Sequence, residues 1–223
     1  MEESRIKLKN ERNFIMKEEK KATRQSYGET LEKLGEKYED IVVLDADLAT
    51  ATKTINFEKK FPERFFDMGI AEANMMSTAA GIATTGKVPF ASTFAVFAAG
   101  RSYDQIRNSI CYPKLNVKIC STHSGITVGE DGATHQMLED ISMMRTLPNM
   151  KVLSPADDIE TKWAIEEAYK QKGPVYVRLS RLATPIIYDE NQEFEFGKMI
   201  QFGSGTDATI FASRRRASRI IKS

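Results

Sequence analysis

One carboxylate stands at the start of a run of small and apolar residues, where it could take part in proton transfer. This residue is Glu72, and the segment 71–85 carries Ala79, Ala80 and Gly81. Such residues lack bulk, so another backbone could approach the predicted helix closely. A helix that is apolar nearly all round is a buried one, and a buried carboxylate must be paired or protonated. Alternatively, Glu72 is a solvated first-turn glutamate favoured by the helix dipole.

A long polar loop holds both histidines of the chain, His123 and His135, with Asp131 between them. Histidine can donate a hydrogen bond or move a proton near neutral pH, and a carboxylate can accept from a hydroxyl. A loop of this length without periodicity is more often functional than idle. The alternative is a surface loop with incidental histidines.

Aromatic and basic residues flank the predicted strands. Phe94 and Phe97 follow one strand, where an aromatic pair belongs more often to a core than to a cofactor site. Arg24 begins the first predicted helix and Arg181 follows the last predicted strand. Each could be a surface arginine. Together at one rim they would suit a sugar phosphate, because guanidinium binds phosphate through two parallel hydrogen bonds.

The elements that must position these side chains alternate between strand and helix. Short apolar runs predict strands at 41–45, 64–67, 88–93, 117–121, 150–153 and 175–179. Helical spacing predicts helices at 23–38, near 57–61, at 71–85, through 103–110 and through 163–168. This alternation indicates an α/β domain with a parallel sheet, whose ligand lies at the carboxyl ends of the strands. No GxGxxG follows a strand, so dinucleotide binding has no support.

The composition is that of an ordinary globular protein, with 41% hydrophobic and 28% charged residues among 223. The apolar runs are too short to span a bilayer, and we expect neither a membrane nor a nucleic-acid partner. Cys111 and Cys120 show no metal or redox spacing, which favours a reducing cytoplasm. Residues 1–21 read as a charged arm and 214–223 as a basic tail.

In order and spacing, these stretches resemble transketolase in its pyrimidine-binding domain, over residues 22–212. The matching pieces are Asp45-Ala46-Asp47-Leu48, Gly69-Ile70-Ala71-Glu72-Ala73-Asn74-Met75, Ser92-Thr93-Phe94 with Phe97, Thr122-His123 through Thr134-His135-Gln136, Ser154-Pro155-Ala156-Asp157 and Leu179-Ser180-Arg181. The resemblance implies a three-layer α/β domain of the thiamine-diphosphate-binding, pyrimidine-domain type. The chain most resembles the C-terminal half of a split transketolase.

The resemblance implies a role for each matching residue at the cofactor. Glu72 matches the catalytic glutamate that hydrogen-bonds N1′ of the thiamine diphosphate aminopyrimidine and favours its imino tautomer. Phe94 and Phe97 match aromatics that line the pyrimidine pocket, and Asp47 matches an acid at that pocket. In such enzymes the cofactor does the carbanion chemistry while the protein sets its geometry.

The resemblance also implies roles at the substrate. His123 and His135 match histidines that contact the donor and acceptor sugars, Asp131 matches an acid that binds a substrate hydroxyl, and Arg24 and Arg181 match phosphate-binding arginines. The implied reaction is reversible transfer of a two-carbon ketol unit from a ketose phosphate to an aldose phosphate.

The chain departs from the family at several points. Gly100 replaces a third pocket aromatic, and Ala51 replaces a serine that helps to hold the phosphate. The GDG motif and the downstream Asn that hold Mg²⁺ and the diphosphate are absent. We therefore expect the Mg²⁺ ligands to come from an N-terminal-half partner chain, within a homo- or hetero-oligomer.

The predicted organisation is an arm at 1–21, a pyrimidine-binding domain at 22–185, a linker and the first strand of a shortened C-terminal domain at 186–213, and a tail at 214–223 that does not fit the family. Three alternatives stay open: an inactive partner-binding fragment, a deoxyxylulose-phosphate-synthase-like subunit, or a 2-oxoacid-dehydrogenase-β-like subunit. The paired histidines and Arg181 favour sugar phosphates and hence transketolase.

Overall fold

In a computed structural model of the protein, the strands predicted from the apolar runs form its centre. The structure describes residues 19–202 and 205–213. The tail at 214–223 and the arm up to residue 18 lie outside these ranges. Six strands form a parallel sheet in the order β3-β2-β4-β5-β7-β6. They are β2 (Ile41–Asp45), β3 (Phe65–Asp67), β4 (Val88–Phe94), β5 (Lys118–Thr122), β6 (Lys151–Leu153) and β7 (Val175–Arg178).

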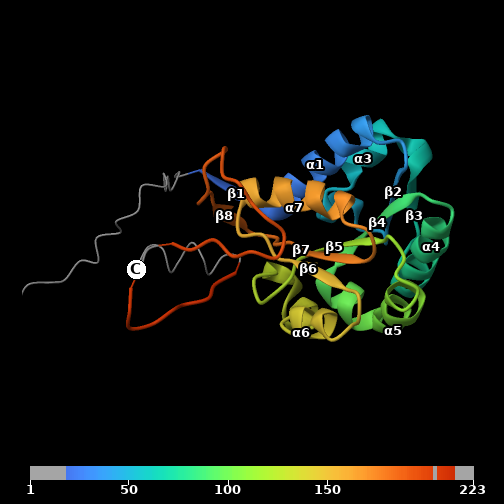
Figure 1. The fold of residues 1–223 in the computed structure, drawn as a ribbon. Helices are drawn as coiled ribbons and strands as arrows, with labels where there is room; N and C mark the ends of the chain where they lie inside the picture. The colour runs from blue at the N-terminus through green and yellow to red at the C-terminus, as the bar shows by residue number, and fades with distance from the viewer. Residues whose placement is uncertain (1–18, 203–204, 214–223) are drawn as a thin grey trace, which may run out of the picture.

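Helices cover both faces of this sheet (Figure 1). One core contains α1 (Thr23–Lys37), α3 (Ile55–Lys60) and α7 (Asp158–Lys170). The other contains α4 (Glu72–Thr84), α6 (Asp140–Arg145) and the helical stretch 96–111, where α5 (Tyr103–Gln105) lies between two π-helical turns. A short α2 (Ala49–Thr52) follows β2. Alternate residues of the buried strands pack into the two cores, so the strands are continuous apolar runs in the sequence. The predicted three-layer α/β class is confirmed.

The carboxyl ends of the strands meet at one edge of the sheet, as the parallel arrangement predicts. Asp45 at the end of β2 pairs in register with Asp67 and with Ser92. Thr93 pairs with Ser121 across β4 and β5. The loops that carry the candidate residues therefore leave the sheet on the same side.

A small antiparallel pair closes the domain and has no counterpart in the sequence analysis. β1 (Lys20–Ala22) runs against β8 (Ala183–Pro185), with Lys21 opposite Thr184. Neither three-residue segment shows the period-two alternation that would mark a strand. The pair places the start of α1 beside the chain that leaves β7.

The segment after β8 packs on α7 through aromatic side chains. The ring of Phe194 lies 5.3 Å from that of Trp163 and 5.0 Å from that of Tyr188. Residues 205–213, part of the predicted first strand of a further domain, form neither helix nor strand. A lone strand has no neighbour here to supply its hydrogen bonds.

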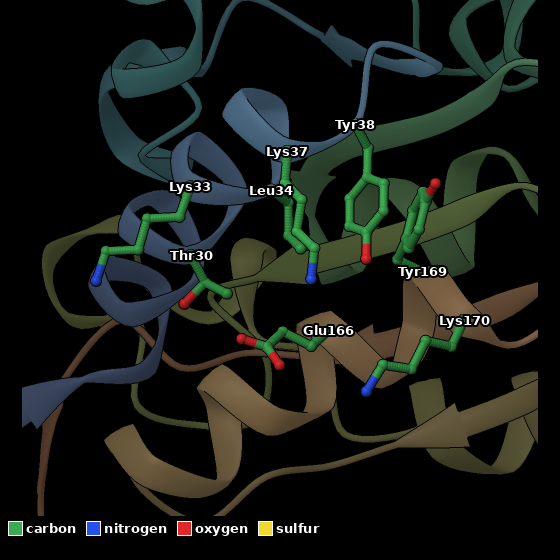
Figure 2. A pocket seen from close by; sticks show the side chains of 8 residues that line it. All are labelled: Thr30, Lys33, Leu34, Lys37, Tyr38, Glu166, Tyr169 and Lys170. Carbon is green, nitrogen blue, oxygen red and sulfur yellow. The ribbon is translucent and has the colours of Figure 1, made fainter.

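A groove of about 190 Å³ lies between α1 and α7 (Figure 2). Its charged lining is exposed, and it includes Lys33, Lys37 and Glu166. Tyr38 and Tyr169 stack at 4.1 Å between ring centroids at one end, near the amino ends of the strands. This groove is a solvated gap between two helices. It lies toward the amino ends of the strands, whereas the candidate residues lie at their carboxyl ends. No helix in the described part of the chain is long and apolar enough to cross a membrane.

Candidate active site

Glu72 is the first residue of α4, and its side chain is only 2% exposed. Nη1 of Arg101 donates to both carboxylate oxygens, at 2.9 Å each. Arg101 is itself half-exposed, so it closes over the carboxylate from the solvent side. Glu72 is thus buried and paired, and the alternative of a solvated first-turn glutamate is wrong.

Two phenylalanine rings lie next to the Glu72–Arg101 pair. Phe94 ends β4 and Phe97 lies in the π-helical turn that follows, and their rings are nearly parallel, with centroids 6.0 Å apart. The guanidinium carbon of Arg101 lies 4.4 Å from the centroid of Phe97. The carboxylate, the guanidinium and the two rings therefore form one contiguous group at the carboxyl edge of the sheet.

His123 extends the cluster through its contact with Phe94. Its ring stacks on Phe94 at 3.7 Å between centroids, and Oγ1 of Thr122 lies 2.9 Å from its Nδ1. Its backbone has a φ of 55°, a region that non-glycine residues rarely adopt. Burial, with Arg24 and Arg181 as further causes, lowers the pKa of His123 to about 3. The imidazole is therefore neutral near pH 7.

His135 reaches the same two rings from the short 3₁₀ turn Ala133–His135. Its ring meets Phe97 edge-on at 5.3 Å and Phe94 at 6.3 Å between centroids. The structure thus brings both histidines and both phenylalanines into a single cluster, although they come from three separate segments.

The two predicted arginines lie near this cluster because α1 starts where β7 ends. Oγ1 of Thr23 lies 3.0 Å from Oγ of Ser180 and accepts from its backbone N–H at 2.7 Å. Arg24 donates to the carbonyl of Ala51 at 2.8 Å. This contact joins the start of α1 to α2.

Arg181 is held by the histidine loop, donating to the carbonyl of Val128 at 2.7 Å and to Oε2 of Glu130 at 2.6 Å. Burial lowers the pKa of Arg24, and the nearby charge of Arg181 lowers it further, whereas Asp131 opposes the shift. One electrostatic environment at the rim thus includes Arg24, Arg181, His123 and the exposed Asp131.

Asp47 lies at the same edge but apart from the cluster. It is exposed, has a φ of 60°, and donates its backbone N–H to Oδ1 of Asp67 at 3.0 Å. Among the described residues no hydrogen bond or ring contact links Asp47 to the aromatic cluster. Nearby Asp45 is fully buried and accepts hydrogen bonds from Thr52 and Thr54. Burial raises the pKa of Asp45 to about 6.

Arg101 is the side chain that the sequence analysis missed. It follows Phe97 by four residues, and that spacing places two side chains on one face of a helix. The backbone N–H of Ser102 donates to the carbonyl of Phe97, so the segment is wound as a π-helix, a form often found at functional sites. Beyond its chain neighbours and its own helix, a Cβ atom built on neighbouring Gly100 would meet no atom within 4 Å, so the Cβ position of Gly100 faces open space.

This architecture is that of an open α/β ligand-binding domain, with its candidate site at the carboxyl edge of the sheet. Residues 19–186 match the family of transketolase pyrimidine-binding domains, and the chain belongs to that family. Within the described ranges no group of three or more His, Cys, Asp or Glu side chains could hold a metal ion.

Two curated relatives and one solved structure give the comparison more detail. A Methanocaldococcus jannaschii protein, provisionally named as a transketolase C-terminal section, is 55% identical over 91% of this chain and 66% of its own length. A 6-deoxy-6-sulfo-D-fructose transketolase subunit of a Clostridium species is 40% identical over 90% of this chain and 62% of its own. A split-gene transketolase, solved as an inactive β4 tetramer, matches 90% of this chain and 65% of its own, with 52% identity and a TM-score of 0.82. The chain therefore spans just under two thirds of these relatives.

Proposed function

We propose that this chain supplies the pyrimidine-binding half of a thiamine diphosphate site in a split transketolase, together with a separate N-terminal-half subunit. The observation that carries the proposal is the buried carboxylate of Glu72, which Arg101 joins to the nearly parallel rings of Phe97 and Phe94. The high identity to a transketolase C-terminal section supports the split arrangement.

The residues present fit the aminopyrimidine of the cofactor in chemical type. A flat heterocycle suits an aromatic surface, and a ring nitrogen suits a carboxyl group that water does not reach. When bound, thiamine diphosphate supplies the carbanion chemistry of ketol transfer. Glu72 holds a proton at N1′, the phenylalanine rings bind the pyrimidine, and Asp47 acts at the margin of the pocket. The N-terminal-half subunit holds Mg²⁺ and the diphosphate.

The remaining cluster binds the sugar phosphates in this proposal. Arg24 and Arg181 are two guanidinium groups in one electrostatic environment, which suits a phosphate dianion. His123 stays neutral, so it binds hydroxyl or carbonyl oxygens as a hydrogen-bonding group rather than as a cation. His135 lines the same space, and Asp131 accepts from a substrate hydroxyl. The reaction is transfer of a two-carbon ketol unit from a ketose phosphate to an aldose phosphate.

The test combines this chain with the N-terminal-half subunit, thiamine diphosphate and Mg²⁺. Ketol transfer from xylulose 5-phosphate to ribose 5-phosphate is followed, with each chain alone as a control. We expect turnover only in the mixture. A stable complex that binds the cofactor but turns over neither these sugars nor 6-deoxy-6-sulfo-D-fructose would contradict the proposal, as would pyruvate decarboxylation without ketol transfer.

A specific comparison bears on the chain in isolation. The split-gene neighbour was solved as an inactive tetramer of one subunit type. We propose that this chain likewise self-associates without activity when its partner is absent. Sedimentation analysis of the chain alone and of the mixture would show whether the partner replaces self-contacts.

A further inference from the structure

Arg101 occupies the approach to Glu72, whose proposed role requires that a ring nitrogen reach its carboxylate. Nη1 of Arg101 lies 2.9 Å from both carboxylate oxygens, and the Glu72 side chain is 2% exposed. A ligand atom at hydrogen-bond distance from Glu72 therefore needs the guanidinium to move aside.

The contacts of Arg101 are those that an aminopyrimidine would need. Its guanidinium is planar, carries N–H donors, lies 4.4 Å from the centroid of Phe97 and binds the carboxylate of Glu72. A planar heterocycle bound to the same carboxylate and the same ring would claim the same space. The two groups are mutually exclusive at this position.

We propose that Arg101 is a displaceable cover of the aminopyrimidine site, one that neutralises Glu72 until the cofactor replaces it; this inference rests on the proposed function. The burial and charge of Glu72 explain why a cover is needed, because an uncompensated buried charge is costly. Because the side chain of Arg101 is half-exposed, the guanidinium can move away into solvent.

The proposal fixes the sign of a measurable effect. If a side chain binds the cofactor, its removal lowers the affinity for thiamine diphosphate. If a side chain covers the site, its removal raises that affinity. The apparent dissociation constant is the intrinsic one divided by the fraction of molecules in the open state. If the ion pair is closed in most molecules, removal of the guanidinium tightens binding by about 5- to 20-fold.

The experiment measures thiamine diphosphate binding by calorimetry in the complex of this chain, its N-terminal-half partner and Mg²⁺. Arg101→Met keeps the apolar stem over Phe97 and removes the charge, while Arg101→Lys keeps a charge without the planar fork. Arg107→Ala is the matched control, because Arg107 is an exposed arginine of the same helical stretch. We expect Arg101→Met to bind thiamine diphosphate about 5- to 20-fold more tightly than wild type, and Arg101→Lys to fall between the two. The control Arg107→Ala should bind as wild type does.

A second measurement needs neither the cofactor nor the partner. In the isolated chain, carbodiimide labelling of Glu72 is compared by mass spectrometry for wild type and both Arg101 variants. We expect labelling at least about fivefold faster without the guanidinium. Equal labelling rates in wild type and the variants would overturn the cover.

The outcomes separate this inference from the proposed function. Cofactor binding by wild type with unchanged or weaker binding by both Arg101 variants overturns the inference alone. No cofactor binding by any chain overturns both the proposed function and the displacement. If Arg101→Met does not fold, Arg101→Lys carries the same comparison.

Discussion

The ionic contact between Glu72 and Arg101 couples a buried group to a half-exposed one. The carboxylate has given up its water and depends on the guanidinium for its hydrogen bonds, whereas the guanidinium keeps half of its surface in solvent. Loss of Arg101 therefore strands a buried charge, while loss of the charge on Glu72 lets Arg101 return to water. Removal of Arg101 therefore costs more free energy of folding than removal of the charge on Glu72.

This asymmetry makes Glu72→Gln a usable probe of the proposed proton role. We expect the variant to fold, because the neutral amide keeps the size of the side chain and frees only an exposed partner. Ketol-transfer turnover in the two-chain mixture should fall at least about 100-fold, as expected for the loss of a proton-holding group. Circular dichroism checks the fold, and a folded variant with a near-wild-type rate would remove Glu72 from the mechanism.

Stacking and burial at His123 predict a pH dependence of stability. The pKa of His123 is about 3 in the folded chain and about 6.5 when unfolded. Below pH 6.5 the unfolded chain therefore takes up a proton that the folded chain refuses, so wild-type stability falls as the pH falls.

The matched comparison is His123→Phe, which keeps the stack on Phe94 and cannot titrate. Between pH 7 and pH 5 the free energy of unfolding of wild type should drop by about 2 kcal/mol relative to the variant. Chemical denaturation at the two pH values measures this difference. A stability gap that does not change with pH would show that His123 takes up a proton as readily in the folded chain as in the unfolded chain.

At this scale, residue types were predictable and contacts were not. The small-residue segment after Glu72 correctly indicated burial, and both histidines lie together with Phe94. The partner of Glu72 could not be predicted, because Arg101 reaches it only through a π-helical turn that no periodicity in the sequence announces. The roles of Glu72, Asp131 and the arginines stay predictions.

The loop after β5 shows how backbone geometry places a side chain. Gly129 has a φ of 79°, and a Cβ atom built there would lie 1.8 Å from Nη1 of Arg181. Gly132, in the same loop, has a φ of 72°, but its Cβ atom would meet only the carbonyl of Glu130, at 3.9 Å. Both glycines have a positive φ, and they differ in their relation to Arg181.

The pair Gly129→Ala and Gly132→Ala separates these effects. Both variants should lose about 1 kcal/mol of stability, since alanine is strained at positive φ. Only Gly129→Ala should also displace Arg181 and raise the KM for a phosphorylated sugar, by about tenfold. Thermal unfolding and steady-state kinetics of the mixture measure the two quantities. An equal rise in KM for both variants would show that Arg181 is not responsible.

Among the elements, those with a strong periodic or apolar pattern were predictable. The central strands, α1 and α4 lie within one residue of their expected bounds, and α7 (Asp158–Lys170) contains the expected 163–168 and extends beyond it at both ends. The three-residue strands β1 and β8 were not predicted because they owe their form to each other rather than to their own sequence. Helix α6 was missed as well. Its Asp140 accepts from Nε of Arg178 at 2.6 Å, a partner 38 residues away.

For the whole molecule, exposed apolar side chains mark where a partner would bind. Ile70 is 75% exposed and Phe66 47% exposed, on either side of the turn that leads to Glu72. Exposed apolar groups beside a candidate site are typical of protein interfaces. In the proposed shared site, the partner subunit covers them.

Ile70→Glu should therefore weaken assembly with the N-terminal-half subunit without unfolding the chain. Burial of one isoleucine accounts for about 10- to 100-fold in affinity. Tyr112→Glu is the control, because Tyr112 is 85% exposed and follows the helical stretch on its return to the amino ends of the strands. Sedimentation equilibrium measures both. Equal weakening by the two variants would place the interface elsewhere.

The antiparallel pair of β1 with β8 has a consequence for how such a domain can be rearranged in evolution. The segments that lead into α1 and away from β7 lie side by side, and three residues of each form the antiparallel pair. A gene can be divided or fused beside this pair without breaking any strand of the central sheet. The same unit can then serve as an independent polypeptide or as an insert within a longer one.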